Sequence, residues 1–288
     1  MRFKHLLAQT IKRIFYPFIK LVIKYIPSSK IIIRSIYNIL PSQWWLNAHN
    51  KPILVNIHDR GIGEYLFLKG EYAPARVTEI KKAVKKGDTV IDIGANIGYF
   101  TILLADLVGP KGRVYAFEPD PRNFSLLQKT IKKNNLTNVI AKQKAVSNKT
   151  GKSLFYQTNS WSSNTLTNIN TNYISTVEVP IIALDDFLSR ENHIKFVKID
   201  TDGSEPLIIQ GMVKLIQRSP GLKILTEYQP GNLKRYLNNP LDFIKIAKQC
   251  GLNFSAIFDS DNGQLPDLDI TPLDQLPDNK NLDLLFTT

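Results

Sequence analysis

The chain has 288 residues, of which 43% are hydrophobic and 22% are charged. This composition can bury a sizeable core, and it excludes a largely disordered chain. Cys250 is the only cysteine, which excludes an intramolecular disulfide and a zinc site built from several cysteines. A single cysteine also fits a reducing compartment, so we expect a cytoplasmic protein.

The N-terminal stretch carries most of the net charge of +12, because nine lysines and arginines precede the first acidic residue, Asp59. Apolar residues recur there at three- and four-residue steps, which predicts a basic amphipathic helical arm over about residues 1–40, kinked at Pro17. Charges interrupt its apolar runs, so we expect neither a membrane span nor a secretory signal. Two interpretations remain. The arm is either a cap packed on the body or, with Trp44 and Trp45 nearby, a peripheral anchor on the inner face of a membrane.

We expect two parts, the helical arm (1–48) and one α/β domain (49–288). The domain opens with two short paired strands, at 53–57 and 64–68, and a helix over 76–86. Strands then alternate with helices, which predicts a parallel sheet with helices on both faces. The expected strands cover 89–93, 113–117, 139–147, 177–184, 195–199 and 222–228, and the expected helices cover 98–108, 121–134, 205–216 and 241–250.

Two segments interrupt this alternation. Residues 158–176 are rich in Asn, Thr and Ser, and they are too long for an ordinary connector, so they form either a substrate loop or a solvated excursion. Near the C-terminus, the expected strands at 254–258 and 282–286 have only a Pro- and Asp-rich loop between them. We expect these two strands to pair antiparallel at one edge of the sheet.

The clearest motif is the strand, turn and helix start of Val-Ile-Asp-Ile-Gly-Ala-Asn-Ile-Gly, residues 90–98. Its glycines follow a Gly-x-x-x-Gly spacing, whereas dinucleotide folds use Gly-x-Gly-x-x-Gly to bind a pyrophosphate. A nucleoside donor without phosphate, S-adenosylmethionine, fits this turn, and the preceding aspartate suits the positive charge or the amino end of that donor. The predicted cofactor-binding residues are therefore Asp92, Gly94, Ala95, Asn96 and Gly98.

Glu118 ends the next expected strand, in Phe117-Glu118-Pro119. A carboxylate at the tip of this second strand can accept hydrogen bonds from both hydroxyls of a ribose. The alternative is a loop acid that caps the following helix, but the separation from the glycine turn favours the ribose interpretation. We expect Asp120 to cap that helix and Ala145, near the end of the third strand, to lie beside the adenine ring.

Several segments, in this order, resemble the FkbM family of methyltransferases over about residues 70–230. The resemblance implies a Rossmann-like seven-stranded class I methyltransferase sheet, S-adenosylmethionine as methyl donor, and usually O-methylation of sugar or natural-product hydroxyls. The family often has Glu-Pro before the cofactor loop, where this chain has Glu71-Tyr72-Ala73-Pro74. The resemblance rests on Gly87–Thr101, Ala116–Pro119, Leu184–Phe187 and Lys198–Glu205 with Gly211.

Asp200, Asp202 and Glu205 follow the fourth strand, at the sheet edge where open α/β sheets bind ligands. An alcohol acceptor must lose its proton, and a carboxylate can accept it. Asp200 is our first candidate base and Asp202 the second, while Glu205 either joins them or caps the next helix. The sequence does not favour a metal, although these carboxylates with Glu227 offer oxygen ligands to a divalent cation such as magnesium.

We therefore expect an S-adenosylmethionine-dependent O-methyltransferase that acts on a hydroxyl of a sugar, glycan, lipid-linked glycan or natural product. One rival is a nucleic-acid methyltransferase that uses the basic arm to bind phosphates. It is not favoured, because the fourth strand ends in Asp-Thr-Asp-Gly and lacks the Asp/Asn-Pro-Pro-aromatic loop of base amino-group methylation. The other rival is a scaffold that kept the fold and lost the chemistry.

Overall fold

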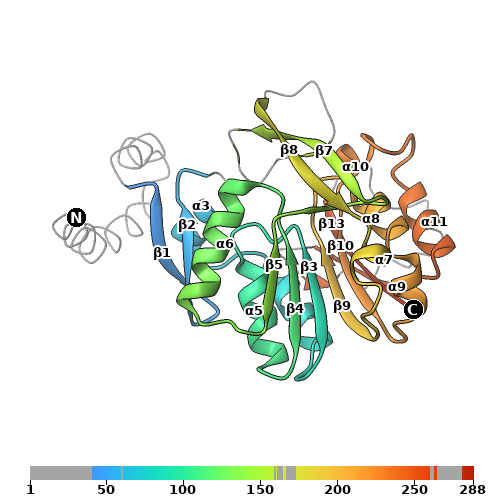
Figure 1. Ribbon diagram of the computed structural model, residues 1–288, viewed down its shortest axis with the longest axis horizontal. Helices are drawn as coiled ribbons and strands as arrows, with labels where there is room; N and C mark the ends of the chain where they lie inside the picture. The colour runs from blue at the N-terminus through green and yellow to red at the C-terminus, as the bar shows by residue number, and fades with distance from the viewer. Residues whose placement is uncertain are drawn as a thin grey trace.

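The computed structural model describes residues 41–59, 61–158, 160, 165–166, 173–259, 263–264 and 281–288. They form an α/β fold around one large mixed sheet (Figure 1). The predicted arm over residues 1–40, and with it both interpretations of its role, lies outside the described residues. No helix within the described ranges is long and apolar enough to cross a membrane.

The main sheet has the strand order β12-β11-β13-β10-β9-β3-β4-β5. Its last two long strands, β13 and β11, pair antiparallel as expected, with β13 inserted between β10 and β11. Apart from the two-residue β12 (Gly263–Gln264), this is the Rossmann-like seven-stranded sheet that the sequence predicts. The parallel strands are β3 (Thr89–Ile93), β4 (Arg113–Phe117), β5 (Val139–Lys142), β9 (Ile194–Ile199) and β10 (Lys223–Tyr228), and the antiparallel pair is β11 (Asn253–Asp259) and β13 (Leu282–Thr287).

Successive side chains of the central strands point to opposite faces of the sheet, and each face is covered by helices. On β3, Val90 packs into one buried apolar cluster and Ile91 into another. The first face carries α3 (Ile62–Lys69), α4 (Pro74–Ala83), α5 (Tyr99–Val108) and α6 (Pro121–Lys133). The second carries α7 (Leu184–Phe187), α8 (Glu205–Gln210), α9 (Val213–Gln217), α10 (Pro230–Leu233) and α11 (Asp242–Gln249).

A β-hairpin of β1 (Gln43–Ala48) and β2 (Lys51–Asn56) packs beside α3 and α6. The expected pairing of 53–57 with 64–68 is wrong, because β2 pairs with β1 and the second segment is helical in α3. The apolar run of α3 has no strict alternation, and a short run of this kind does not distinguish a strand from a helix. The expected division after residue 48 falls at the turn of this hairpin.

A second, three-stranded sheet has the order β6-β8-β7, and the expected strand over 139–147 breaks after Lys142 where it joins this sheet. The short β6 (Ala145–Val146) leaves the main sheet to pair with β8 (Tyr173–Ile182), which also pairs with β7 (Gly151–Thr158). The expected helix over 205–216 divides into α8 and α9 at Gly211. A Cβ there would lie 2.0 Å from the carbonyl oxygen of Ser147, so the small sheet approaches the backbone closely.

The order in which the chain adds parallel strands to the sheet reverses at β3, which has β4 on one side and β9 on the other. Open α/β sheets bind ligands in the crevice outside the carboxyl ends of the strands at such a switch point. The segments after Ile93, Phe117 and Ile199 therefore meet at one edge of the sheet, where the sequence places its candidate residues.

Candidate active site

One cavity opens at this switch point. Its walls come from the loops after β3, β4 and β9, from α3 and the segment before α4, and from the small sheet. Glu118 lies after β4, and Asp200 and Asp202 lie after β9. The lining residues are Gly61, Ile62, Tyr72, Ile93, Gly94, Asn96, Phe117, Glu118, Pro119, Asn123, Lys144, Ala145, Val146, Phe155, Thr165, Leu166, Asp200, Thr201, Asp202 and Ser204.

The glycine turn has left-handed backbone at Gly94, Asn96 and Gly98, with φ of 73°, 51° and 98°. Gly94 lines the cavity, but its lack of a side chain serves a contact between loops. A Cβ at this position would lie 1.9 Å from the carbonyl oxygen of Asp200. At Gly98 a Cβ would meet Leu127 of α6 at 2.8 Å. Both glycines therefore let backbone and neighbouring elements approach, and only Gly94 does so at the cavity wall.

The carboxylate of Glu118 is held by backbone N–H groups at the cavity wall. The N–H of Asn96 donates to Oε2 at 2.7 Å, and the N–H of Asp120 donates to Oε1 at 2.9 Å. Burial raises the pKa of Glu118 to about 7, although these two hydrogen bonds oppose the rise. Each oxygen has a remaining lone pair, so the fixed carboxylate can accept hydrogen bonds from two adjacent hydroxyls.

Of the remaining predicted cofactor residues, some line the cavity and others do not. Asn96 and Ala145 line the cavity beside Glu118. Ala95 is buried against α6 and does not line it. Asp120 caps α6 as expected, since its side chain accepts from the N–H of Arg122 at 2.7 Å.

Asp92 is fully buried beneath the turn and does not line the cavity. Its Oδ2 accepts a hydrogen bond from Thr101 Oγ1 at 2.7 Å, and its Oδ1 pairs with Lys198 Nζ at 3.2 Å. Lys198 also donates to the carbonyl of Gly94 at 2.9 Å. A direct contact between Asp92 and a cofactor is therefore not supported by this arrangement. The aspartate instead anchors the lysine that supports the glycine turn.

The segment after β9 makes a sharp turn at Asp202 and Gly203. Asp202 and Gly203 have φ of 54° and 112°, and Gly203 packs so closely on α10 that a Cβ would lie 2.5 Å from the carbonyl of Asn232. The side chain of Asn232 donates to Asp202 Oδ1 at 3.2 Å. Burial, together with the charges of Asp200 and Glu205, raises the pKa of Asp202 well above its ordinary value. Asp202 is thus a cavity carboxylate with a raised affinity for protons.

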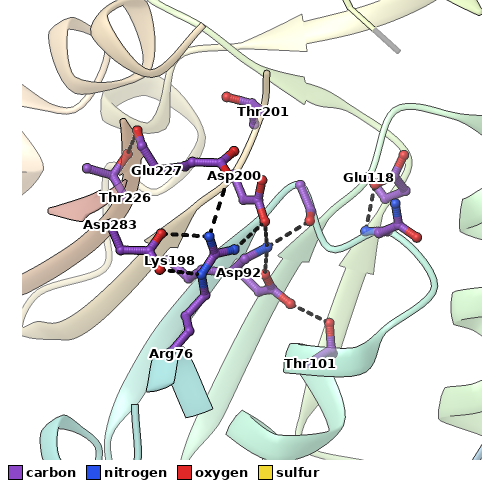
Figure 2. A network of polar contacts seen from close by, with 12 residues as sticks. Arg76, Asp92, Thr101, Glu118, Lys198, Asp200, Thr201, Thr226, Glu227 and Asp283 are labelled. Atoms are coloured by element: carbon purple, nitrogen blue, oxygen red, sulfur yellow. Dashed lines mark hydrogen bonds and ion pairs between the residues drawn. The ribbon is translucent and has the colours of Figure 1, made fainter. Parts of the chain in front are cut away.

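Asp200 lines the same cavity but has a different environment (Figure 2). Its Oδ2 lies 2.7 Å from Arg76 Nη1 and 3.7 Å from Lys198 Nζ. Burial opposes ionisation, but these two cations outweigh it and lower the pKa of Asp200. A carboxylate with a lowered pKa is a weak proton acceptor. The order of preference between the two candidate bases is therefore reversed, with Asp202 ahead of Asp200.

Glu205 begins α8 and is buried, and it does not line the cavity. Its Oε1 accepts from both the N–H and the hydroxyl of Thr201 at 3.0 Å. These bonds tie the loop after β9 to the first turn of α8. The geometry supports the helix-start role of Glu205 and gives it no direct access to an acceptor.

Arg76, on α4, is the main residue that sequence reasoning missed. It is 4% exposed, and its guanidinium contacts one carboxylate in β10, one in β13 and one directly after β9 (Figure 2). It holds Asp283 of β13 in a two-point contact of 3.0 and 2.6 Å, Asp200 at 2.7 Å and Glu227 of β10 at 3.7 Å. We call these four residues the Arg76 cluster. The guanidinium takes up two of the carboxylates that the sequence offered to a divalent cation. No three His, Cys, Asp or Glu residues in the described ranges are grouped to hold a metal.

Two sequence signals could have indicated buried ion pairs. Lys198 lies among apolar residues in the buried half of β9, Asp283 is the one charge of β13, and a charge in a buried strand needs a partner. Arg76 carries no such signal, because α4 also contains Glu79, Lys81 and Lys82. The segment before α4, Glu71-Tyr72-Ala73-Pro74, where the chain differs from the family's usual Glu-Pro, also contributes a residue to the cavity wall. Glu71 is exposed, whereas Tyr72 lines the cavity and its backbone is held by the Tyr99 hydroxyl at 2.9 and 3.2 Å.

The residues present fit S-adenosylmethionine, a cofactor with a ribose, an adenine and a positively charged sulfur. Glu118 offers a fixed acceptor for ribose hydroxyls, and apolar groups of Phe117, Ala145 and Val146 lie beside it. Among the described lining residues there are three carboxylates and one lysine, an excess that favours a cation. The strand order and this site together define the class of S-adenosylmethionine-dependent methyltransferases.

Within that class, the model of the Methyltransferase FkbM domain family matches residues 92–252, more than half of the chain. The protein therefore belongs to the FkbM methyltransferase family, and S-adenosylmethionine is its cofactor.

Individual relatives are more distant. The chain is similar to a "Probable cobalt-precorrin-6B C(15)-methyltransferase (decarboxylating)" of Saccharolobus solfataricus, at 35% identity over 28% of this chain and 43% of the relative. It is also similar to "Methyltransferase 1" of Beauveria bassiana, at 26% identity over 43% of this chain and 57% of the relative. The matches thus span about half the length of these relatives. The solved structure of a methyltransferase from Aquifex aeolicus is 14% identical, with a TM-score of 0.44, over 80% of this chain and 94% of that one.

Proposed function

We propose that this protein transfers a methyl group from S-adenosylmethionine to the oxygen of a hydroxyl on a sugar, glycan, lipid-linked glycan or natural product. The observation that carries the proposal is that Asp202, with its raised pKa, and Glu118 face one cavity. One carboxylate suits the ribose of the donor, and the other suits the proton of an acceptor hydroxyl. Because the two carboxylates lie on different loops of one cavity, the donor and the acceptor can be bound there together.

The chain's residues divide the chemistry between them. S-adenosylmethionine supplies a methyl carbon made electrophilic by the adjacent positive sulfur. Glu118 accepts hydrogen bonds from the two ribose hydroxyls and fixes the orientation of the donor. Asp202 would accept the proton of the acceptor hydroxyl as the hydroxyl oxygen takes up the methyl group, with the electron pair of the methyl–sulfur bond left on the sulfur of the donor. The proton leaves the site from Asp202 after transfer.

The apolar part of the cavity supports exclusion of water around this reaction. Ile62, Phe155 and Leu166 line it opposite the sheet edge. Leu166, with Thr165, belongs to the Asn-, Thr- and Ser-rich segment that the sequence marks as a substrate loop or a solvated excursion. The backbone of Thr165 lies beside β7, because it pairs with the backbone of Tyr156 at 2.8 and 3.2 Å. We therefore propose that Thr165 and Leu166 of this segment form part of the acceptor wall.

The test is methyl transfer from labelled S-adenosylmethionine into glycolipid, glycan and small-molecule fractions, with RNA and DNA as separate arms. We expect label in an alkali-stable ether of one of the first three fractions. Asp202→Asn should retain cofactor binding and lower the rate of methyl transfer at least tenfold, because the amide cannot accept the proton. The matched control is Asp186→Asn, which changes an exposed aspartate bonded to Thr150 on the surface.

Three results would contradict the proposal. Label in RNA or DNA alone would replace the acceptor class with nucleic acid. Unchanged transfer in Asp202→Asn would remove Asp202 as the base. If calorimetry detects no binding of S-adenosylmethionine, the chain is a scaffold that kept the fold and lost the chemistry.

A further inference from the structure

The Arg76 cluster joins parts of the chain that lie far apart in the sequence. Arg76 comes from α4, ahead of the glycine turn, while Asp283 comes from the last strand of the sheet. Asp283 is 1% exposed and makes the two-point contact with the guanidinium. The face of Phe100 covers the other side, with its ring centre 5.7 Å from Arg76 Cζ. The side chain of Arg76 is therefore fixed from several directions.

The free end of this fixed guanidinium holds Asp200. Nη1 donates to Asp200 Oδ2 at 2.7 Å, and the same oxygen faces Lys198 Nζ at 3.7 Å. A carboxylate held between two cations is ionised and cannot turn freely toward a substrate. Asp202, two residues later, has no lysine or arginine within ion-pair distance among the described residues. Its contacts are the amide of Asn232 and, through its carbonyl oxygen, Arg235 at 3.1 Å.

We propose that Arg76 is a positioning residue that assigns different tasks to the two aspartates: it holds Asp200 as a fixed counter-ion and leaves Asp202 to take the acceptor's proton. The assignment of the base rests on the proposed function above, whereas the effect of Arg76 on the two carboxylates does not. The charge of Asp200 raises the proton affinity of Asp202, so the guanidinium acts on Asp202 through Asp200.

Other charged groups also face each aspartate and affect its pKa. Asp200 is faced by Lys198 from β9, Arg76 from α4, Glu227 from β10 and, through the guanidinium, Asp283 from β13. Burial and the charge of Asp200 raise the pKa of Glu227 well above its ordinary value. The groups that face Asp202 are Asp200 from the end of β9, Glu205 from α8, Arg235 from the segment after α10 and Glu227 from β10.

The first experiment needs no acceptor. Aspartate carboxyl carbons are labelled with ¹³C, and their pH titrations are followed by NMR in the full chain and in Arg76→Gln. The signals of Asp200 and Asp202 are assigned from Asp200→Asn and Asp202→Asn. Removing the guanidinium should raise the midpoint of Asp200 by about 1–3 pH units, the usual effect of an adjacent opposite charge. Asp200, still beside Lys198, stays ionised where Asp202 titrates, so loss of the positive charge should raise the midpoint of Asp202 by up to about one pH unit.

Two further variants separate position from charge. Arg76→Lys restores a positive charge but cannot hold Asp283 at two points and reach Asp200 together, so it should restore only part of both shifts. Asp283→Asn is the matched control, because it disturbs the same buried cluster and leaves the contact between Arg76 and Asp200 in place. It should leave the midpoint of Asp202 within about 0.3 pH units of the parent, far inside the shift expected for a lost neighbouring charge.

If Arg76→Gln fails to fold, Asp200→Asn decides the question, since its amide oxygen can still accept from Arg76. The midpoint of Asp202 should fall by about one pH unit in that variant, because the neighbouring negative charge is removed. A midpoint of Asp202 that does not rise in folded Arg76→Gln, or does not fall in Asp200→Asn, would overturn the proposal.

A kinetic readout follows once a glycolipid, glycan or small-molecule fraction accepts label. In Arg76→Gln, the acidic limb of the pH profile for kcat should move to higher pH, while the dissociation constant for S-adenosylmethionine stays within about twofold. In Asp200→Asn the limb should move to lower pH, because Asp202 loses the neighbouring charge that raises its pKa. Loss of transfer at every pH in Asp200→Asn would make Asp200 the base and overturn the assignment. If no fraction accepts label, the proposed function fails, but the NMR titration still tests the role of Arg76.

Discussion

The two acidic regions of the cavity face the same ligand space but are stabilised in opposite ways. Glu118 is held by two backbone N–H groups, at 2.7 and 2.9 Å. Asp200 is held by the guanidinium of Arg76 and the ammonium of Lys198, at 2.7 and 3.7 Å. Backbone donors fix a carboxylate in place without a full countercharge. Ion pairs fix it and also supply the opposite charge.

The pKa directions follow from this difference. Burial raises the pKa of Glu118 to about 7, whereas the two cations overcome burial and lower the pKa of Asp200. A site can therefore contain one carboxylate that changes charge near neutral pH and another that does not. The partner of a buried acid, and not burial alone, therefore decides which role the acid can fill.

The largest effect should come from breaking the Arg76 cluster. Arg76→Gln leaves Asp283, at 1% exposure, without its countercharge, and losing one partner of a buried ion pair costs about 3–5 kcal/mol. Urea unfolding monitored by circular dichroism measures the change. Asp283→Asn should cost less, because Arg76 keeps Asp200 and Glu227 as partners. Equal stability of Arg76→Gln and the parent would show that the cluster contributes nothing to the fold.

The meeting of Glu118 with the glycine turn was predictable from sequence because its parts are local. The glycine turn and Glu118 each directly follow a strand whose apolar pattern is clear, and parallel strands bring such ends together. The late antiparallel pair was predictable from its two apolar strands, whereas the seven-stranded sheet was implied by the resemblance to the FkbM family. The break after Lys142 was not, because its cause is the pairing of β6 with β8, about 35 residues later in the chain.

The Arg76 cluster could not be predicted, because its members span residues 76 to 283 and no local pattern connects them. Which aspartate is the better base depends on this cluster, so sequence reasoning preferred Asp200. The helical conformation of α3 was also missed, since Leu66 and Phe67 are buried by the hairpin β1–β2 and not by their own sequence neighbours.

Glu118→Ala should weaken the binding of S-adenosylmethionine, because it removes the proposed acceptor of the ribose hydroxyls. Hydrogen bonds to a charged group contribute about 1.5–3 kcal/mol, so affinity for S-adenosylmethionine should fall about tenfold to a hundredfold. Titration calorimetry measures it. The control is Glu178→Ala, an exposed glutamate paired with Lys152 on the small sheet, which should bind as the parent does. Retained affinity in Glu118→Ala would remove the ribose assignment.

The pH dependence of binding should sharpen the contrast between the two carboxylates. Because the pKa of Glu118 is about 7 and ribose hydroxyls donate to its ionised form, affinity should rise with pH until Glu118 is fully ionised. Below about pH 7 it should fall by up to tenfold per pH unit, the limit for one linked proton. Calorimetry in buffers of different ionisation enthalpy should detect one proton released on binding at pH 6, and Glu118→Gln should abolish that release. Binding that is independent of pH from 5.5 to 8 would contradict a titrating Glu118.

The smallest effect should come from an arginine–carboxylate pair at the other end of the sheet. Arg113 contacts Glu191 at 2.9 Å, but its side chain is 49% exposed, so water screens the charges and mobile side chains lose entropy in forming the pair. Arg113→Ala should lower the free energy of unfolding by about 0.2–1 kcal/mol, measured by urea unfolding beside Arg76→Gln. Both arginines pair with carboxylates at similar distances, 2.9 and 2.7 Å. A comparable loss in the two variants would show that distance governs their contribution, whereas a several-fold larger loss at Arg76 attributes it to burial and to the shared hold on three carboxylates.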